Sequence, residues 1–106
     1  MELQEYVDSN GRNRFERWFQ TLNDSAARKV TIALSRMEAG NTSNIKWFDG
    51  IGEYRINWGP GYRVYLVQDG ERLIILFGGG TKKTQQSDIR MAKKLLKEYK
   101  STKSDG

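Results

Sequence analysis

Four basic side chains in the second half of the chain are the main candidates for chemistry. Arg55 and Arg63 lie in the segment GEYRINWGPGYRVYL, and Lys82 and Lys83 follow the glycines of LIILFGGGTKKTQQ. Arginine offers a planar fork of donors to phosphate oxygens, and lysine offers a mobile point charge. If the fold gathers these cations, a bound anion such as a phosphodiester relieves their repulsion. Tyr65 beside them offers an aromatic surface on which a base can stack.

The residue types that the chain lacks restrict any catalysis further. Among its 106 residues there is no His and no Cys. The side chain best suited to proton transfer near neutral pH is therefore absent, and zinc sites and thiol nucleophiles are excluded. Any catalysis must therefore use Lys, Arg, Asp, Glu, Tyr or backbone groups.

The overall charge and the hydropathy bear on partners and location. Lys and Arg outnumber Asp and Glu by 18 to 13, which favours a nucleic acid or an acidic protein as partner. No apolar run approaches the roughly 20 residues of a membrane span, and the first residues do not resemble a signal peptide. With no Cys, the composition fits a reducing compartment. We therefore expect a cytoplasmic protein without membrane contact.

Hydrophobic periodicity predicts an α+β fold. Asn13 with Glu16 three residues later resembles the capping box of a helix, and Gly40 lies where a helix that begins near Asn23 should end. From Ile45 the pattern alternates as strands do. We expect an N-terminal strand at about residues 2–7 and a helical hairpin whose helices span about 13–22 and 23–40. A three-stranded antiparallel meander should follow at about 53–58, 62–67 and 72–77, and a C-terminal helix at about 88–99. One domain over residues 1–99 and a disordered tail over 100–106 complete the prediction.

The alternation within the first hairpin predicts its register. A three-residue loop, Gly59-Pro60-Gly61, places Trp58 opposite Tyr62 and sorts the apolar side chains onto one face. The other face then receives Asn57 opposite Arg63, and Arg55 opposite Tyr65.

The second hairpin extends this pattern. A turn at Asp69-Gly70 that pairs Val67 with Arg72 places Leu73, Ile75 and Phe77 on the apolar face under the helices, and Ile74 and Leu76 on the arginine face. The third strand then delivers Lys82 and Lys83 close to Arg63. An alternative interpretation is a solvated face whose arginines pair with Glu53, Asp69 or Glu71.

Three motifs together resemble a known family. The segments GEYRI and GPGYRVY, followed by GG-x-KK-x-Q-x-x-DI, are similar to the RelE/ParE superfamily of bacterial toxins, and more narrowly to the HigB-like addiction module killer protein group. The likeness covers about residues 47–96. It implies the fold expected above and the toxin of a type II toxin–antitoxin system. Such toxins cut mRNA on the ribosome by attack of the RNA 2′-hydroxyl on the adjacent phosphorus, so the resemblance implies neither a metal nor a cofactor. A cognate antitoxin, here expected to be a helix-turn-helix protein, silences them.

The resemblance also implies roles for single residues. Arg63 matches the central-strand arginine that contacts the scissile phosphate, and Lys82 and Lys83 match basic residues that stabilise the transition state or protonate the leaving oxygen. Arg55 is expected to clamp phosphate, and Asn57, Tyr65 and Gln85 are expected to contact RNA. Because some relatives use a late His or Tyr, the general base stays open here between a lysine with a lowered pKa and Glu53.

Two other functions fit part of the pattern. A ParE-like inhibitor of DNA gyrase shares the superfamily, although such proteins generally lack the clustered basic residues. A non-enzymatic RNA-binding module would also carry a basic sheet face.

Overall fold

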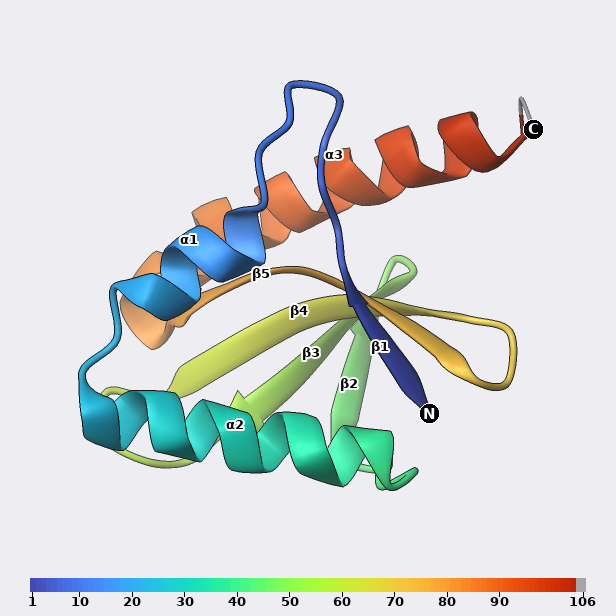
Figure 1. Ribbon diagram of the computed structural model, residues 1–106. Coiled ribbons are helices and arrows are strands. Elements are labelled where there is room, and N and C mark those ends of the chain that lie inside the picture. The colour runs from blue at the N-terminus through green and yellow to red at the C-terminus, as the bar shows by residue number, and fades with distance from the viewer. Residues whose placement is uncertain (105–106) are drawn as a thin grey trace.

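The computed structural model describes residues 1–104, which form an α+β fold of five strands and three helices around one mixed sheet (Figure 1). The strands follow the order β1-β5-β4-β3-β2 across the sheet. β1 pairs parallel to β5, and the other neighbours are antiparallel. The elements are β1 (Glu2–Glu5), α1 (Arg14–Gln20), α2 (Asp24–Glu38), β2 (Ile45–Phe48), β3 (Ile51–Ile56), β4 (Tyr62–Asp69), β5 (Leu73–Thr81), a 3₁₀ turn (Lys82–Thr84) and α3 (Gln85–Ser104).

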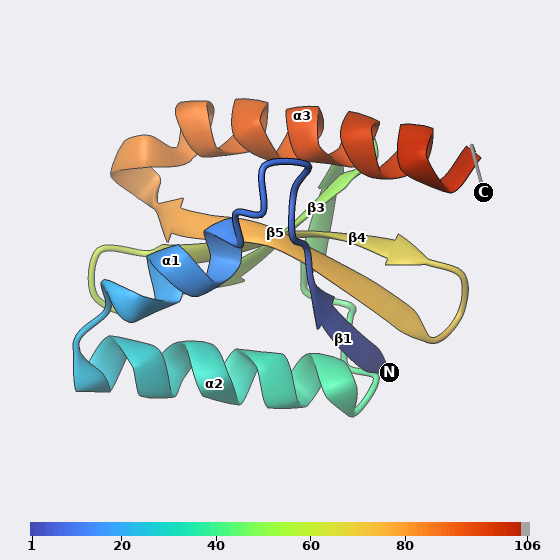
Figure 2. The same ribbon diagram turned by 45° about the horizontal axis from the view of Figure 1, so that its top comes forward.

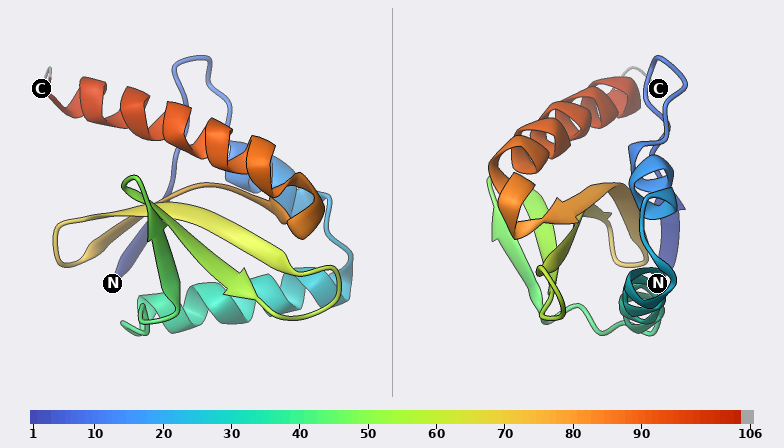
Figure 3. Two further views of the ribbon diagram at one scale, coloured as in Figure 1. Left: turned by 180° about the vertical axis from the view of Figure 1, so that it is seen from behind. Right: turned by 90° about the vertical axis from the view of Figure 1, so that its left-hand side faces the viewer.

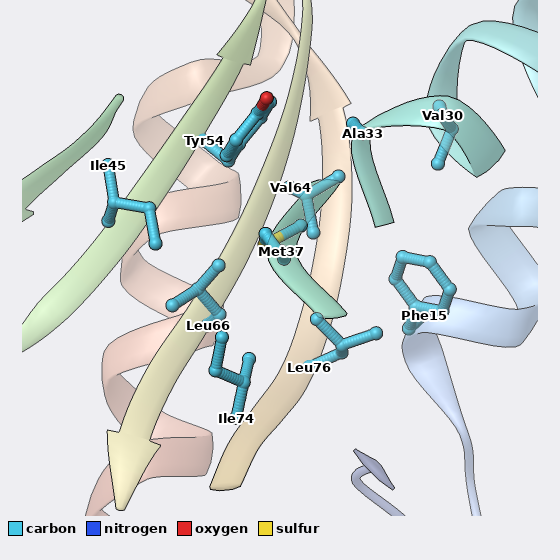
Figure 4. Packing of buried hydrophobic residues seen from close by; sticks show 10 residues of the cluster. All are labelled: Phe15, Val30, Ala33, Met37, Ile45, Tyr54, Val64, Leu66, Ile74 and Leu76. Carbon is cyan, nitrogen blue, oxygen red and sulfur yellow. The ribbon is translucent and has the colours of Figure 1, made fainter. Parts of the chain in front are cut away.

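The helical hairpin begins where the capping residues predict. Asn13 and Asn23 each accept a hydrogen bond at 2.9 Å from a backbone N–H three residues later, which satisfies a donor that the first helical turn leaves unpaired. α1 and α2 cover one face of the sheet (Figure 2). Between them and the sheet lies a core cluster, shown in Figure 4, of Phe15, Val30, Ala33, Met37, Ile45, Tyr54, Val64, Leu66, Ile74 and Leu76.

The sheet contains a strand that the sequence analysis missed. β2 pairs with β3 through a two-residue turn at Asp49-Gly50, and both turn residues have positive φ, 50° and 88°. This is the Asp-Gly geometry that closes the tightest hairpins. The meander therefore has four antiparallel strands rather than three.

The opposite face of the sheet is covered by α3 (Figure 3). The buried residues there are Ile51, Tyr65, Ile75, Phe77, Ala92, Leu95 and Leu96. Both faces thus carry a buried apolar cluster, whereas we expected helices on one face only.

The expected tail is partly wrong, because α3 continues through residue 104 instead of ending near 99. Tyr99 donates a hydrogen bond to Asp69, and Lys103 Nζ lies 2.6 Å from both Asp69 carboxylate oxygens, so tertiary contacts hold the last turns. Residues 105 and 106 lie outside the described residues. No helix in the described range is long and apolar enough to cross a membrane.

The register of the first hairpin differs from the prediction. Leu66 lies opposite Gly52 instead of Tyr54, and the loop runs over 57–61. The slip is two residues, an even number, so each side chain keeps its predicted face. Arg55 now lies directly opposite Arg63, and Glu53 opposite Tyr65.

The register of the second hairpin changes the faces. Val67 lies opposite Ile75 instead of Arg72, because the turn holds three residues, 70–72. This slip is odd, so the apolar residues of β5 exchange faces: Ile74 and Leu76 face the helical hairpin, and Ile75 and Phe77 face α3. A bulge at Phe77 then shifts the rest of the strand, so that Gly78 pairs with Tyr65 and Gly80 with Arg63.

Candidate functional site

A buried carboxylate organises the predicted site. Glu53 on β3 is 0% exposed and lies on the sheet face that α3 covers. Arg55 Nε donates to its Oε1 at 2.6 Å, and Gln85 Nε2 donates to its Oε2 at 3.0 Å. Arg63 Nε lies 3.7 Å from the same Oε2. One carboxylate therefore holds residues from β3, β4 and the start of α3 together.

The strand register explains why the site needs this carboxylate. Arg55 and Arg63 lie directly opposite each other, and like charges in that arrangement destabilise a sheet. Glu53 offsets that repulsion. The alternative interpretation expected a solvated face whose arginines pair with an acid. The pairing is confirmed for Glu53, but the face is not solvated, because α3 covers it and Glu53 and Arg63 are buried. Asp69 pairs instead with Lys103 at the far end of the sheet.

The surroundings of Glu53 keep it ionised. Burial opposes the charged form, but hydrogen bonds from Arg55 and Gln85 and the charge of Arg55 outweigh it, so the pKa of Glu53 lies below its ordinary value. Because Glu53 is buried and already bonded, it suits a positioning role better than that of a general base.

Arg63 is largely enclosed in the free protein. It is 8% exposed, and its Nη1 donates to the Gly61 carbonyl at 3.0 Å. The backbone N–H of Lys82 donates to the same oxygen at 3.1 Å. The turn that carries Lys82 and Lys83 therefore lies beside Arg63, as expected, and both lysines are exposed. No described residue hydrogen-bonds Arg63 Nε.

Two predicted RNA contacts are placed differently. Asn57 lies in the loop beyond the last β3–β4 pair rather than opposite Arg63. There it lines a separate cavity of about 310 Å³ with Lys29, Arg36 and Trp58, which Arg55 also borders. The ring of Tyr65 is 1% exposed and packs under α3, so it offers no open face for stacking.

The buried hydroxyl of Tyr65 has an unusual environment. Tyr65 Oη lies near the Glu53 carboxylate, but no described group forms a hydrogen bond of normal geometry with it. Burial raises the pKa of Tyr65, and the charge of Glu53 opposite it raises that pKa further. The phenol therefore stays protonated at neutral pH and remains a donor.

Asp88 belongs to the site but was missed from the sequence. Its Oδ2 accepts from Thr84 Oγ1 at 2.5 Å, and burial raises its pKa although that hydrogen bond opposes the shift. A Cβ at Gly80 would lie 1.9 Å from this oxygen, and Gly80 pairs with Arg63. The Asp88 carboxyl thus fills the space that a side chain at position 80 would occupy, on the same sheet face as Arg63. The glycine run at 78–80 could have indicated this position, because a strand residue without a side chain leaves room for one from a neighbouring helix.

The sequence was also compared with known proteins. It matches no family model. An uncharacterized protein of Haemophilus influenzae is 43% identical to it over 86 residues, which cover 79% of this chain and 87% of that protein. The two proteins belong to one family. The relative's name carries no activity, so function has to be inferred from the site.

Proposed function

We propose that the chain is the toxin of a type II toxin–antitoxin system, in the HigB-like group of the RelE/ParE superfamily, and that it acts as a ribosome-dependent, metal-independent mRNA endoribonuclease. One observation carries the proposal: Glu53 joins Arg55 and Arg63, and the Lys82 backbone N–H bonds the Gly61 carbonyl that Arg63 also binds, so the turn with Lys82 and Lys83 begins at the same end of the sheet. The cations outnumber the acids there, so the site retains positive charge for an RNA phosphate.

The hydrogen bonds of Arg63 suggest how RNA engages it. Its Nη1 is bonded to the Gly61 carbonyl, and among the described groups its Nε has no hydrogen-bond partner. A phosphate oxygen can take the place of the Gly61 carbonyl if the glycine-rich loop over 57–61 moves, and Gly59 and Gly61 both have positive φ there. Glu53 then orients both arginines while staying ionised.

The proposed reaction is the one that the family resemblance implies. The RNA 2′-oxygen attacks the adjacent phosphorus and loses its proton to a base, and the bond to the 5′-oxygen breaks as that oxygen gains a proton. The products are a 2′,3′-cyclic phosphate and a 5′-hydroxyl. Arg63 stabilises the negative charge that develops on the phosphorane oxygens, and Lys82 or Lys83 stabilises the leaving oxygen.

The expected partners follow from the same proposal. The cognate antitoxin either neutralises the basic end of the sheet or displaces α3, which covers Tyr65 and supplies Gln85 and Asp88. A small helix-turn-helix protein encoded next to this chain is the expected antitoxin, and it should bind the purified chain.

Primer extension on an mRNA translated with the purified protein tests the proposal. In-frame cuts within codons, which depend on translation, support it. Gyrase-linked DNA breaks without RNA cuts would instead identify a ParE-like gyrase inhibitor. RNA binding with neither outcome would identify a non-enzymatic RNA-binding module.

A further inference from the structure

A cavity of about 170 Å³ lies between β5, α1 and the first turns of α3, next to the candidate site. We call it the α1–α3 pocket. Its polar lining comes from Arg14, Tyr65 and Asp88, and its apolar lining includes Phe77 and Met91. This pocket is not used by the phosphate chemistry proposed above.

The pocket contains buried donors that are poorly satisfied. In the described chain, Tyr65 Oη and Arg14 Nε are buried and make no hydrogen bond of normal geometry: Tyr65 Oη has only the Glu53 carboxylate near it, and Arg14 Nε lies 3.8 Å from Asp8 Oδ2. A buried, unpaired polar group is costly, and each one in a folded protein calls for an explanation. A ligand that accepts hydrogen bonds would satisfy both donors.

The pocket lies next to the phosphate site. Asp88 Oδ2 lies against Gly80, the ladder partner of Arg63, and Tyr65 lies two residues after Arg63 on the same strand and face. That spacing is about 7 Å along a strand. A nucleotide whose phosphate is held at Arg63 can therefore bring a base to Tyr65.

The size of the pocket selects the kind of ring. A cavity of about 150 Å³ in another protein holds one benzene molecule, so 170 Å³ matches a single six-membered ring more closely than the larger purine. A pyrimidine presents ring carbonyl acceptors to the Tyr65 and Arg14 donors, and an N–H or amino donor to the Asp88 carboxylate. We propose that the α1–α3 pocket binds a pyrimidine base, uracil or cytosine, of the RNA. The identity of the RNA rests on the proposed function, but binding can be tested without cleavage.

Gly78 offers a way to close the pocket. It pairs with Tyr65 and lines the cavity, and no atom of the described residues lies within 4 Å of a Cβ built on it, chain neighbours aside. Gly78→Val should therefore fill the space beside Tyr65 without a clash. Tyr65→Phe removes only a hydroxyl that makes no hydrogen bond of normal geometry, so it should fold nearly as well as the wild type. Tyr62→Phe, on the same strand but facing Trp18 and Trp58, is the matched control.

The test is a titration of the full chain with UMP, CMP and AMP, in which binding is monitored by NMR through the amide chemical shifts. We expect UMP or CMP at millimolar concentration to shift the Gly78 and Asp88 amides saturably, and AMP to bind at least about fivefold more weakly. Tyr65→Phe should weaken pyrimidine binding by roughly three- to tenfold, the loss of one net hydrogen bond. Gly78→Val should abolish the shifts, and Tyr62→Phe should leave them unchanged.

Several results would overturn the inference. Equal binding of AMP, absence of saturable shifts, shifts confined to Lys82 and Lys83, or unaltered affinity in Tyr65→Phe would each do so. If the chain binds pyrimidines but cuts no translated mRNA, the pocket assignment stands and the proposed function is wrong. If the chain cuts mRNA but shows no pyrimidine binding in the titration, only the pocket assignment is wrong.

Discussion

Replacing Glu53 by Gln tests how the site is held together. The amide keeps the shape of the side chain but removes the charge between two arginines that face each other across β3 and β4. Breaking a buried ion pair by removing one partner costs about 3–5 kcal/mol. Because the Arg55 side chain is 33% exposed and keeps part of its hydration, we expect the lower end, about 3 kcal/mol.

This loss should be visible in thermal unfolding followed by circular dichroism. At roughly 4 °C per kcal/mol for a domain of this size, Glu53→Gln should lower the Tm by about 12 °C. Asp49→Asn is the matched control, since it makes the same chemical change in an ion pair with Lys93 whose side chains are 77% and 42% exposed. Its Tm should stay within error of the wild type, because exposed pairs contribute little.

Acid pH should reduce the difference between the wild type and Glu53→Gln. Because the pKa of Glu53 is lowered in the folded state, its contribution is complete above the unfolded value, about 4.3, and is lost as pH falls through the folded value. The two unfolding free energies should therefore converge on acidification. A Glu53→Gln protein as stable as Asp49→Asn at neutral pH would refute the organising role of this carboxylate.

Two further changes test the glycine run and the end of α3. A Cβ at Gly79 would lie 2.3 Å from the Trp18 ring, so Gly79→Ala should lower the free energy of unfolding by about 1–3 kcal/mol, as measured by urea denaturation. Gly78→Ala should be neutral or slightly stabilising, because a Cβ there meets open space. Equal free energies of unfolding for the two variants would contradict the packing of α1 on β5. Asp69→Asn should speed amide exchange over residues 99–104 and lower the pKa of Tyr99, which its hydrogen bond to Asp69 raises to about 12. Unchanged exchange there would mean that Asp69 does not hold the last turns of α3.

The parts of the fold that were predictable are those set by local signals. Asn13 and Asn23 cap their helices through hydrogen bonds three residues away, and strand alternation assigned Arg55 and Arg63 to one face. The β2–β3 hairpin had its own local signal, Asp49-Gly50, and was missed because β2 is only four residues long.

The registers were not predictable in this way because they depend on loop length. The slip of two in the first hairpin was harmless, but the slip of three in the second brought Ile75 and Phe77 beneath α3 and thereby buried Tyr65. Burial on both faces of the sheet could not be read from alternation alone. The same is true of Asp88, whose place beside Arg63 depends on how α3 packs over Gly80.

The measurement that tests the central claim most directly is primer extension on translated mRNA with wild type, Arg63→Ala and Arg72→Ala. Without Arg63, Glu53 still bonds Arg55 and Gln85, so the variant should remain folded, as circular dichroism can check. Arg72 is exposed in the turn at the other end of β4 and serves as the control. We expect codon-dependent cuts with the wild type and Arg72→Ala, and cleavage slower by about 100-fold or more with Arg63→Ala. Cleavage at the wild-type rate by a folded Arg63→Ala protein would contradict the account.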